Sequence, residues 1–217
     1  MRSWNKEELY QFIAWVRGKN ADRLESFPVD VISLCHEIGV SVEWYNFRTH
    51  GLKGMVSVEE DSIILNGRLP LEEVRACCAH ELVHLALHRE EAPHFYLCGG
   101  TDRSPPDRML EWQANEGAAE LLVPMHILLP MLKLHVPQCR DHDDFEQMKI
   151  FLAKLFGVTP RAIATRLEAL RYEIDQYIKG IPIEEIRILS LSVQKVLEIR
   201  IESLNTKFSY ISLDYAC

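Results

Sequence analysis

The sequence predicts an α+β fold in which a short block of strands lies among helices. Apolar and polar residues alternate over residues 40–44 and 55–58, the period of strands in a small antiparallel sheet. Segments on both sides of this block repeat apolar residues every three or four positions, as amphipathic helices do. With 217 residues, 47% of them hydrophobic, the chain can bury a sizeable core in one or two domains.

The elements follow in order from local signals. Asn5 and Glu8 resemble a capping box for a first helix that ends near Gly18. A short helix is expected over residues 28–38, with proline at its start and Gly39 after its end. Two strands then follow, and a third is expected at residues 63–65 after an acidic turn.

The next predicted helix, residues 71–88, carries the sequence His80-Glu81-Leu82-Val83-His84. Histidines four residues apart lie on one helix face, about 40° out of alignment, so both imidazoles can bind one metal ion. Glu81 would lie beside the open coordination position and accept a proton from a metal-bound water. The motif therefore predicts His80 and His84 as metal ligands and Glu81 as a catalytic base.

A third ligand is expected from the helix that ends before Pro124. Glu111 lies in its first turn, after Asp107 as a candidate cap. Two histidines and a glutamate with an open fourth position form the catalytic zinc arrangement of thermolysin. Glu116 and Glu120, on the same predicted helix, are the alternative third ligands.

Four further residues are candidates for supporting roles. His84 with His88 is an alternative ligand pair, but no glutamate follows His84 to serve as a base. Asn115, one turn after Glu111, could hydrogen-bond a ligand. His88, His94 and Tyr96 are candidates for stabilising the oxyanion of a tetrahedral intermediate.

The rest of the chain is predicted to be largely helical. Residues 89–107 read as a loop that could form a rim or lid over the site. Helices are expected over residues 125–134, 144–156 and 159–178, while residues 186–213 suit either a strand or a helix.

A helix-turn-helix spacing occurs within this part: a small residue, Ala153, then Gly157 in the expected turn, then the apolar Ile163. Arg161 and Arg166 lie on its second helix, so nucleic acid could be contacted through residues 145–171. An ordinary αα-hairpin is the alternative. The net charge of -8 disfavours a broad electrostatic grip on nucleic acid, so such binding is not the expected role.

Composition points to a cytoplasmic location. The six cysteines show no CxxC and no disulfide-framework spacing, which is typical of reduced thiols. No apolar run has the length of a membrane span, and residues 1–10 lack the apolar core of a signal peptide, so no membrane partner is expected.

Two stretches resemble the ImmA/IrrE metallopeptidase family, over roughly residues 25–175. The first runs from Gly51-Leu52-Lys53-Gly54 through Ile64-Leu65-Asn66 to the motif at residues 79–84; the second is Glu111-x-x-Ala114-Asn115, continuing to Pro124. The resemblance implies a thermolysin-like (gluzincin-type) metallopeptidase core, followed by a helix-turn-helix-like segment. We accordingly expect a catalytic domain at 1–135, the helix-turn-helix-like segment at 136–180, and a C-terminal extension at 181–217.

The resemblance also implies a function. Family members are bacterial and phage proteases that cleave a helix-turn-helix repressor of a mobile element or stress response. Carried over to this chain, His80, His84 and Glu111 would bind one Zn²⁺, or alternatively Mn²⁺ or iron, and Glu81 would be the general base. The alternative is a non-catalytic metal-binding or DNA-binding regulator.

This chain departs from the family at two positions of the motif helices. The family usually has a small residue where Val83 stands and an aromatic residue where Gly117 stands. Neither position is a predicted ligand, so we expect the departures to affect packing.

Overall fold

The computed structural model describes residues 4–19, 27–48, 51–89, 95–98 and 108–211. Contacts divide the chain into two compact units: Met1–Trp4 with Glu8–Leu122, and Asn5–Glu7 with Val123–Cys217. The predicted motif lies in the first unit. The division falls after residue 122, earlier than the boundary expected after residue 135, because α6 (Met125–His135) packs on α9 (Arg171–Ile178) of the second unit.

The first unit contains a four-stranded sheet in the order β1-β3-β2-β4. Its strands are β1 (Ser41–Tyr45), β2 (Gly54–Ser57), β3 (Ser62–Asn66) and β4 (Phe95–Cys98). The antiparallel sheet expected from the sequence is a mixed sheet, because β1 pairs in parallel with β3 while β2 is antiparallel to both β3 and β4. Alternation shows which residues of a strand face the core, but it does not show which strand becomes its neighbour.

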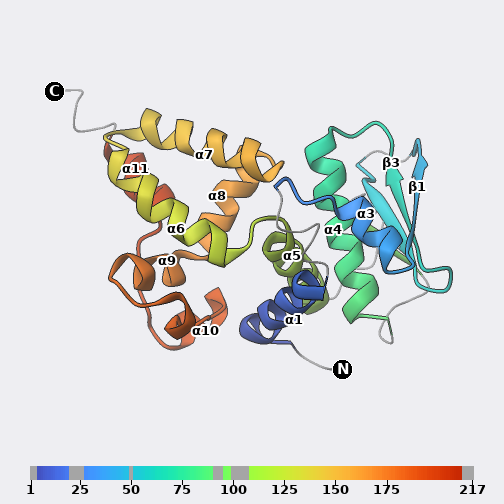
Figure 1. The fold of residues 1–217 in the computed structure, drawn as a ribbon, viewed down its shortest axis with the longest axis horizontal. Helices are drawn as coiled ribbons and strands as arrows, with labels where there is room; N and C mark the ends of the chain where they lie inside the picture. Colours follow the sequence, from blue (N-terminus) through green and yellow to red (C-terminus); the bar gives the residue numbers. More distant parts are fainter. Residues whose placement is uncertain (1–3, 20–26, 49–50, 90–94, 99–107, 212–217) are drawn as a thin grey trace. The chain divides into compact units, whose positions relative to one another are not determined.

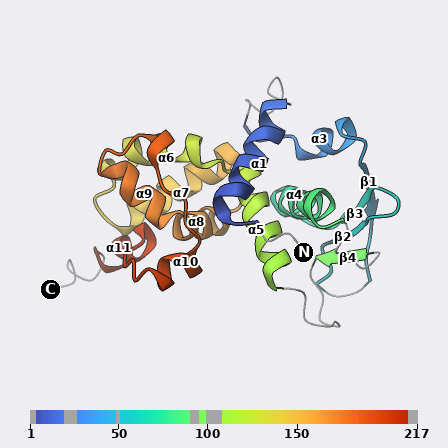
Figure 2. The same ribbon diagram turned by 90° about the horizontal axis from the view of Figure 1, so that it is seen from below.

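The helices of the first unit are α1 (Lys6–Lys19), whose first two residues are assigned to the second unit, α3 (Val31–Glu37), α4 (Leu71–Leu87) and α5 (Arg108–Leu122). Helix α4 packs on β2 and β3 with one side and on α5 with another, as Figure 2 shows. Ten of its side chains are buried, including every residue from Cys77 to Leu85. A helix covered on several sides can place polar groups in the interior only where other polar groups meet them.

Two glycines permit this close packing. A Cβ atom added at Gly54 of β2 would lie 2.6 Å from the Cys77 Sγ atom on α4. At Gly117 of α5, a Cβ atom would lie 3.1 Å from both γ-carbons of Val83 and 3.3 Å from Leu9. The two departures from the family pattern therefore face each other: the valine on α4 fills space that a side chain at position 117 would occupy.

The second unit is helical. After α6 come α7 (His142–Phe156), α8 (Pro160–Ala169), α9, α10 (Leu191–Val196) and α11 (Leu204–Ile211), with short 3₁₀ turns at Val136–Gln138 and Ile183–Glu185 (Figure 1). The single helix expected over residues 159–178 is broken at Leu170, which has φ -99° and ψ 8° and is fully buried. Over residues 186–211, where the sequence allowed either a strand or helices, the structure has α10 and α11.

In the described part of the chain, no single helix combines the length and apolar character needed to cross a membrane. The helix pair Arg108–Leu122 and Met125–Gln138 meets the length and composition test only when taken together.

Candidate metal centre

Helix α4 presents two histidines to one point. The relative exposure of His80 is 8% and that of His84 is 1%, and their Nε2 atoms lie 3.0 Å apart. This close approach follows from the four-residue spacing, which places the side chains one above the other on the same face. Each ring turns its Nε2 atom to the same place and its Nδ1 atom away from it.

Helix α5 brings a carboxylate to the same point. Glu111 Oε2 lies 3.5 Å from His80 Nε2, and Glu111 Oε1 lies 3.4 Å from His84 Nε2. Among the described residues, His80, His84 and Glu111 are the one group of three whose candidate ligand atoms converge, all within 4.8 Å of one another. Glu111 remains 32% exposed, so the group is open on one side.

These distances suit a tetrahedral ion. Zinc bonds to histidine nitrogen and carboxylate oxygen are about 2.0–2.2 Å long, which places neighbouring ligand atoms of a tetrahedron about 3.4 Å apart. The observed separations of 3.0, 3.4 and 3.5 Å lie close to this value. The donor set of two imidazoles and one carboxylate, with room for a fourth ligand, therefore fits Zn²⁺.

The alternative third ligands have other contacts. The Glu116 carboxylate accepts a hydrogen bond from the Tyr10 hydroxyl. Glu120 is buried and interacts electrostatically with Arg17. Neither belongs to the converging group found among the described residues.

The environment favours the protonation states that bind metal. Burial, followed by the nearby positive charge of His84, lowers the pKa of His80 from 6.5 to about 4, which favours the neutral imidazole. The pKa of Glu111 is lowered chiefly by the hydrogen bond that it accepts from His84 when that ring is protonated, and further by the charge of protonated His80, which favours the carboxylate. Metal binding requires both of these deprotonated forms.

The outer nitrogen atoms of both histidines are also bonded. His80 Nδ1 lies 3.2 Å from Asn115 Oδ1, while Asn115 Nδ2 donates to the Glu111 carbonyl at 2.8 Å. His84 Nδ1 lies 2.9 Å from His88 Nδ1, and His88 Nε2 lies 2.8 Å from Gln113 Oε1. Since both ring nitrogens of His88 are bonded within the protein, it is poorly suited to stabilise an oxyanion.

Gln113 was not among the residues predicted from the sequence, although it is fully buried at the site. It lies three residues after Leu110 and four before Gly117, both of them buried on α5. A glutamine on a core-facing position of a helix was the available signal, because buried amides need polar partners.

Three residues with predicted catalytic roles remain: Glu81, His94 and Tyr96. Glu81 is fully buried on α4, next to His80 in sequence. Tyr96 pairs through its backbone with Val56 in the sheet, but its side chain lies outside the described residues, as does His94 altogether. For Glu81 and Tyr96 the catalytic roles stay predictions.

The helix-turn-helix-like spacing corresponds to α7 and α8, which are joined through Gly157 in the left-handed conformation (φ 63°). Ala153 and Ile163 are buried, as that spacing predicts. Arg166 is 2% exposed and its Nε atom donates to the Val123 carbonyl at 3.1 Å. It therefore stabilises the second unit rather than offering a charge to nucleic acid.

A mixed sheet, a helix with two converging histidines and a facing glutamate together define a protein with a site of the metallopeptidase type. Residues 35–168 match the Peptidase M78 family, described as the IrrE N-terminal-like domain. The match spans more than half of the 217 residues, and the chain belongs to this family. The resemblance seen in the sequence is confirmed. No curated protein matches the chain.

Proposed function

We propose that this protein is a zinc-dependent endopeptidase. The observation that carries the proposal is the convergence of His80, His84 and Glu111 within 4.8 Å in a chain of a peptidase family. The thermolysin-like assignment of the core, the repressor substrate and the cytoplasmic location belong to the same proposal and rest on the resemblance and composition described above.

In the proposed hydrolysis, side chains of this protein hold the metal ion and transfer a proton. His80, His84 and Glu111 would hold the ion, which lowers the pKa of water and polarises the carbonyl of the scissile peptide bond. Glu81 accepts a proton from the attacking water and delivers it to the amide nitrogen as the carbon–nitrogen bond breaks. The products are one carboxylate and one amine, so water is the only co-reactant.

The first test is metal content. Mass spectrometry on the purified protein should find about one zinc ion per chain, and the His84→Ala/Glu111→Ala variant should hold almost none. Equal zinc content in the two proteins, or no zinc uptake by either after incubation with zinc, would contradict the site.

The second test separates catalysis from binding. Glu81→Gln should retain zinc while cleavage of a helix-turn-helix repressor falls about 100-fold or more, because the base is lost but the ligands remain. If this variant cleaves as fast as the unmodified protein, Glu81 is not the base. Zinc binding by both proteins with no cleavage by either would favour a metal-binding regulator.

A further inference from the structure

A hydrogen-bonded chain leads from His84 to the start of α1. His84 Nδ1 lies 2.9 Å from His88 Nδ1, and His88 Nε2 lies 2.8 Å from Gln113 Oε1. Gln113 Nε2 then donates to the backbone carbonyl of Trp4 at 3.3 Å. The chain thus connects α4, α5 and the residues just before α1, and His84, His88 and Gln113 are all at most 1% exposed.

The direction of each hydrogen bond follows from the last acceptor. A backbone carbonyl can only accept, so the amide nitrogen of Gln113 faces Trp4 and its oxygen faces His88. An amide oxygen also only accepts, so the hydrogen of a neutral His88 is on Nε2 and its Nδ1 atom is an acceptor. His84 must then donate from Nδ1, which leaves the lone pair of its Nε2 atom directed toward Glu111.

We propose that His88 and Gln113 are positioning residues that hold His84 in its metal-binding tautomer, with the Trp4 carbonyl fixing the direction of the chain. The proposal rests on the proposed function, in which His84 is a ligand. It adds a role for the segment before α1, which no part of the metal-binding motif indicates. A ligand imidazole commonly donates its other N–H to a partner that sets the ring orientation.

The two ligand histidines differ in this respect. The partner of His80, Asn115, is exposed, and its own amide bonds back to Glu111 within α5. The partner of His84, His88, is buried and is oriented through Gln113 by the Trp4 carbonyl, which lies just before α1. Breaking the buried series of hydrogen bonds at Gln113 should therefore weaken metal binding at His84, to which Gln113 is linked through His88.

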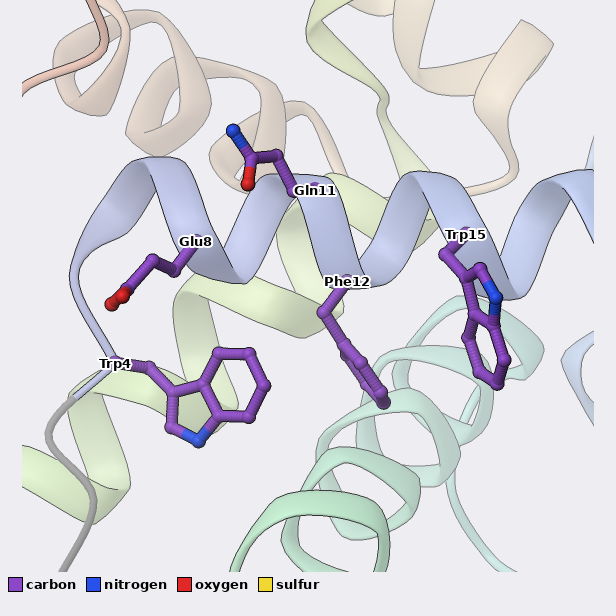
Figure 3. Close-up of a pocket in the computed structure, with 5 residues that line it drawn as sticks. All are labelled: Trp4, Glu8, Gln11, Phe12 and Trp15. Atoms are coloured by element: carbon purple, nitrogen blue, oxygen red, sulfur yellow. The ribbon is translucent and has the colours of Figure 1, made fainter.

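Aromatic packing holds the end of the chain in place. Figure 3 shows the rings of Trp4, Phe12 and Trp15 on the same side of α1. The Trp4 and Phe12 ring centroids are 5.5 Å apart, and those of Phe12 and Trp15 are 6.0 Å apart. Trp4 is thereby attached to the helix that follows it, and its carbonyl is held toward Gln113.

The direct test is ¹⁵N NMR of the imidazole rings in metal-free protein at about pH 8, where histidines are ordinarily neutral. We expect the hydrogen of His84 on Nδ1 and that of His88 on Nε2. The opposite tautomer at either residue would overturn the proposal. Because this readout needs no metal and no substrate, it stands apart from the test of the metal site.

The second test compares two variants by zinc competition titration. Gln113→Met keeps the side-chain length but removes the amide, and we expect it to weaken zinc binding about 10- to 100-fold. Tyr10→Phe is the matched control, because it removes a buried hydrogen bond from α1 to Glu116 of α5 and should leave zinc affinity unchanged. The visible spectrum of the cobalt-substituted protein should change only in Gln113→Met.

Four outcomes separate the proposal from its alternatives. Zinc affinity of Gln113→Met equal to that of the unmodified protein would overturn the proposal, as would an equal loss in Tyr10→Phe, which would indicate general helix packing. If Gln113→Met does not fold, the NMR result on the unmodified protein decides. If His84→Ala binds zinc normally while the tautomers are as expected, the proposed metal site fails and the hydrogen-bonded chain stands.

Discussion

The histidine group of the first unit (His80, His84 and the partly exposed Glu111) and the buried Lys6–Glu173 pair of the second bring their polar atoms together in opposite ways. Lys6 Nζ lies 2.9 Å from Glu173 Oε1 and 2.8 Å from the Ala169 carbonyl, and Glu173 also accepts from the Leu189 amide at 3.0 Å. In the Lys6–Glu173 pair, hydrogen-bond donors therefore face acceptors. In the histidine group, two Nε2 atoms and a carboxylate, all acceptors in their metal-binding forms, face one another.

This difference separates a structural polar cluster from a binding site. Opposite charges that satisfy each other need nothing further, and removing one of them leaves the other buried and uncompensated. Acceptors that converge are stabilised by a cation placed between them. The comparison therefore predicts that breaking the Lys6 pair lowers folding stability without affecting metal binding, whereas changes in the histidine group affect metal binding.

The largest effect on stability is expected from breaking the buried pair. Lys6→Met should lower the free energy of unfolding by about 3–5 kcal/mol, because it leaves the fully buried Glu173 without its cation. Urea denaturation measures the loss, and zinc per folded chain should stay unchanged. Lys6→Met/Glu173→Met should recover most of the stability, and a double variant as unstable as the single one would contradict this account.

Acid should destabilise the metal-free protein through the histidine group. Because the pKa of His80 is about 4 in the folded protein, the unfolded chain takes up a proton below about pH 6.5 while the folded protein does not. The unfolding free energy of metal-free protein should therefore fall between about pH 6.5 and 4, by up to about 3 kcal/mol. His80→Gln should flatten the dependence in this window. An unchanged slope would show that His80 is not its source.

Packing beneath the histidines is expected to matter less. Gly117→Ala brings a methyl group within 3.1 Å of Val83, so overpacking should outweigh the gain in helix propensity and cost about 1 kcal/mol. In a Val83→Ala background, the same change should instead stabilise the protein, because only the contact with the end of the Leu9 side chain at 3.3 Å remains. A double-mutant cycle measured by thermal unfolding tests this reversal of sign, and additive effects would contradict it.

The smallest effect is expected at an exposed ion pair that serves as a control for Lys6. Lys179 Nζ lies 2.8 Å from Asp175 Oδ2, about as close as Lys6 lies to Glu173, but the Lys179 side chain is 69% exposed. Lys179→Met should change the unfolding free energy by less than about 0.5 kcal/mol. A loss comparable to that of Lys6→Met would show that burial is not what distinguishes the two pairs.

The sequence predicted the helices better than the sheet. The capping-box pattern of Asn5 and Glu8, with Gly18 near the end, located α1 closely, because helix signals are local. The parallel pairing of β1 with β3 depends on contacts between segments distant in the chain, and β4 fell within a predicted loop. The break at Leu170 was also missed, since the spacing of apolar residues continues across it.

In the candidate site, too, local features were predictable from the sequence and contacts between distant segments were not. The approach of His80 to His84 follows from the helical repeat, so the sequence was sufficient to predict it. The contact of Glu111 with both histidines depends on the packing of α5 against α4, which left Glu116 and Glu120 as alternatives at the sequence level. The core-facing position of Gln113 on α5 was a usable signal, but its acceptor, the Trp4 carbonyl, was beyond prediction, since a backbone acceptor leaves no mark in a sequence.

The contact between Val83 and Gly117 has an evolutionary consequence. The arrangement that the resemblance implies for the family, small on α4 and aromatic on α5, cannot be converted into this one by a single substitution. Enlarging position 83 first would crowd the helix pair, whereas shrinking position 117 first would leave a hole that the later valine could fill. Homologues with a large residue at 83 should therefore carry a small one at 117, and ancestral intermediates should have had the hole rather than the clash.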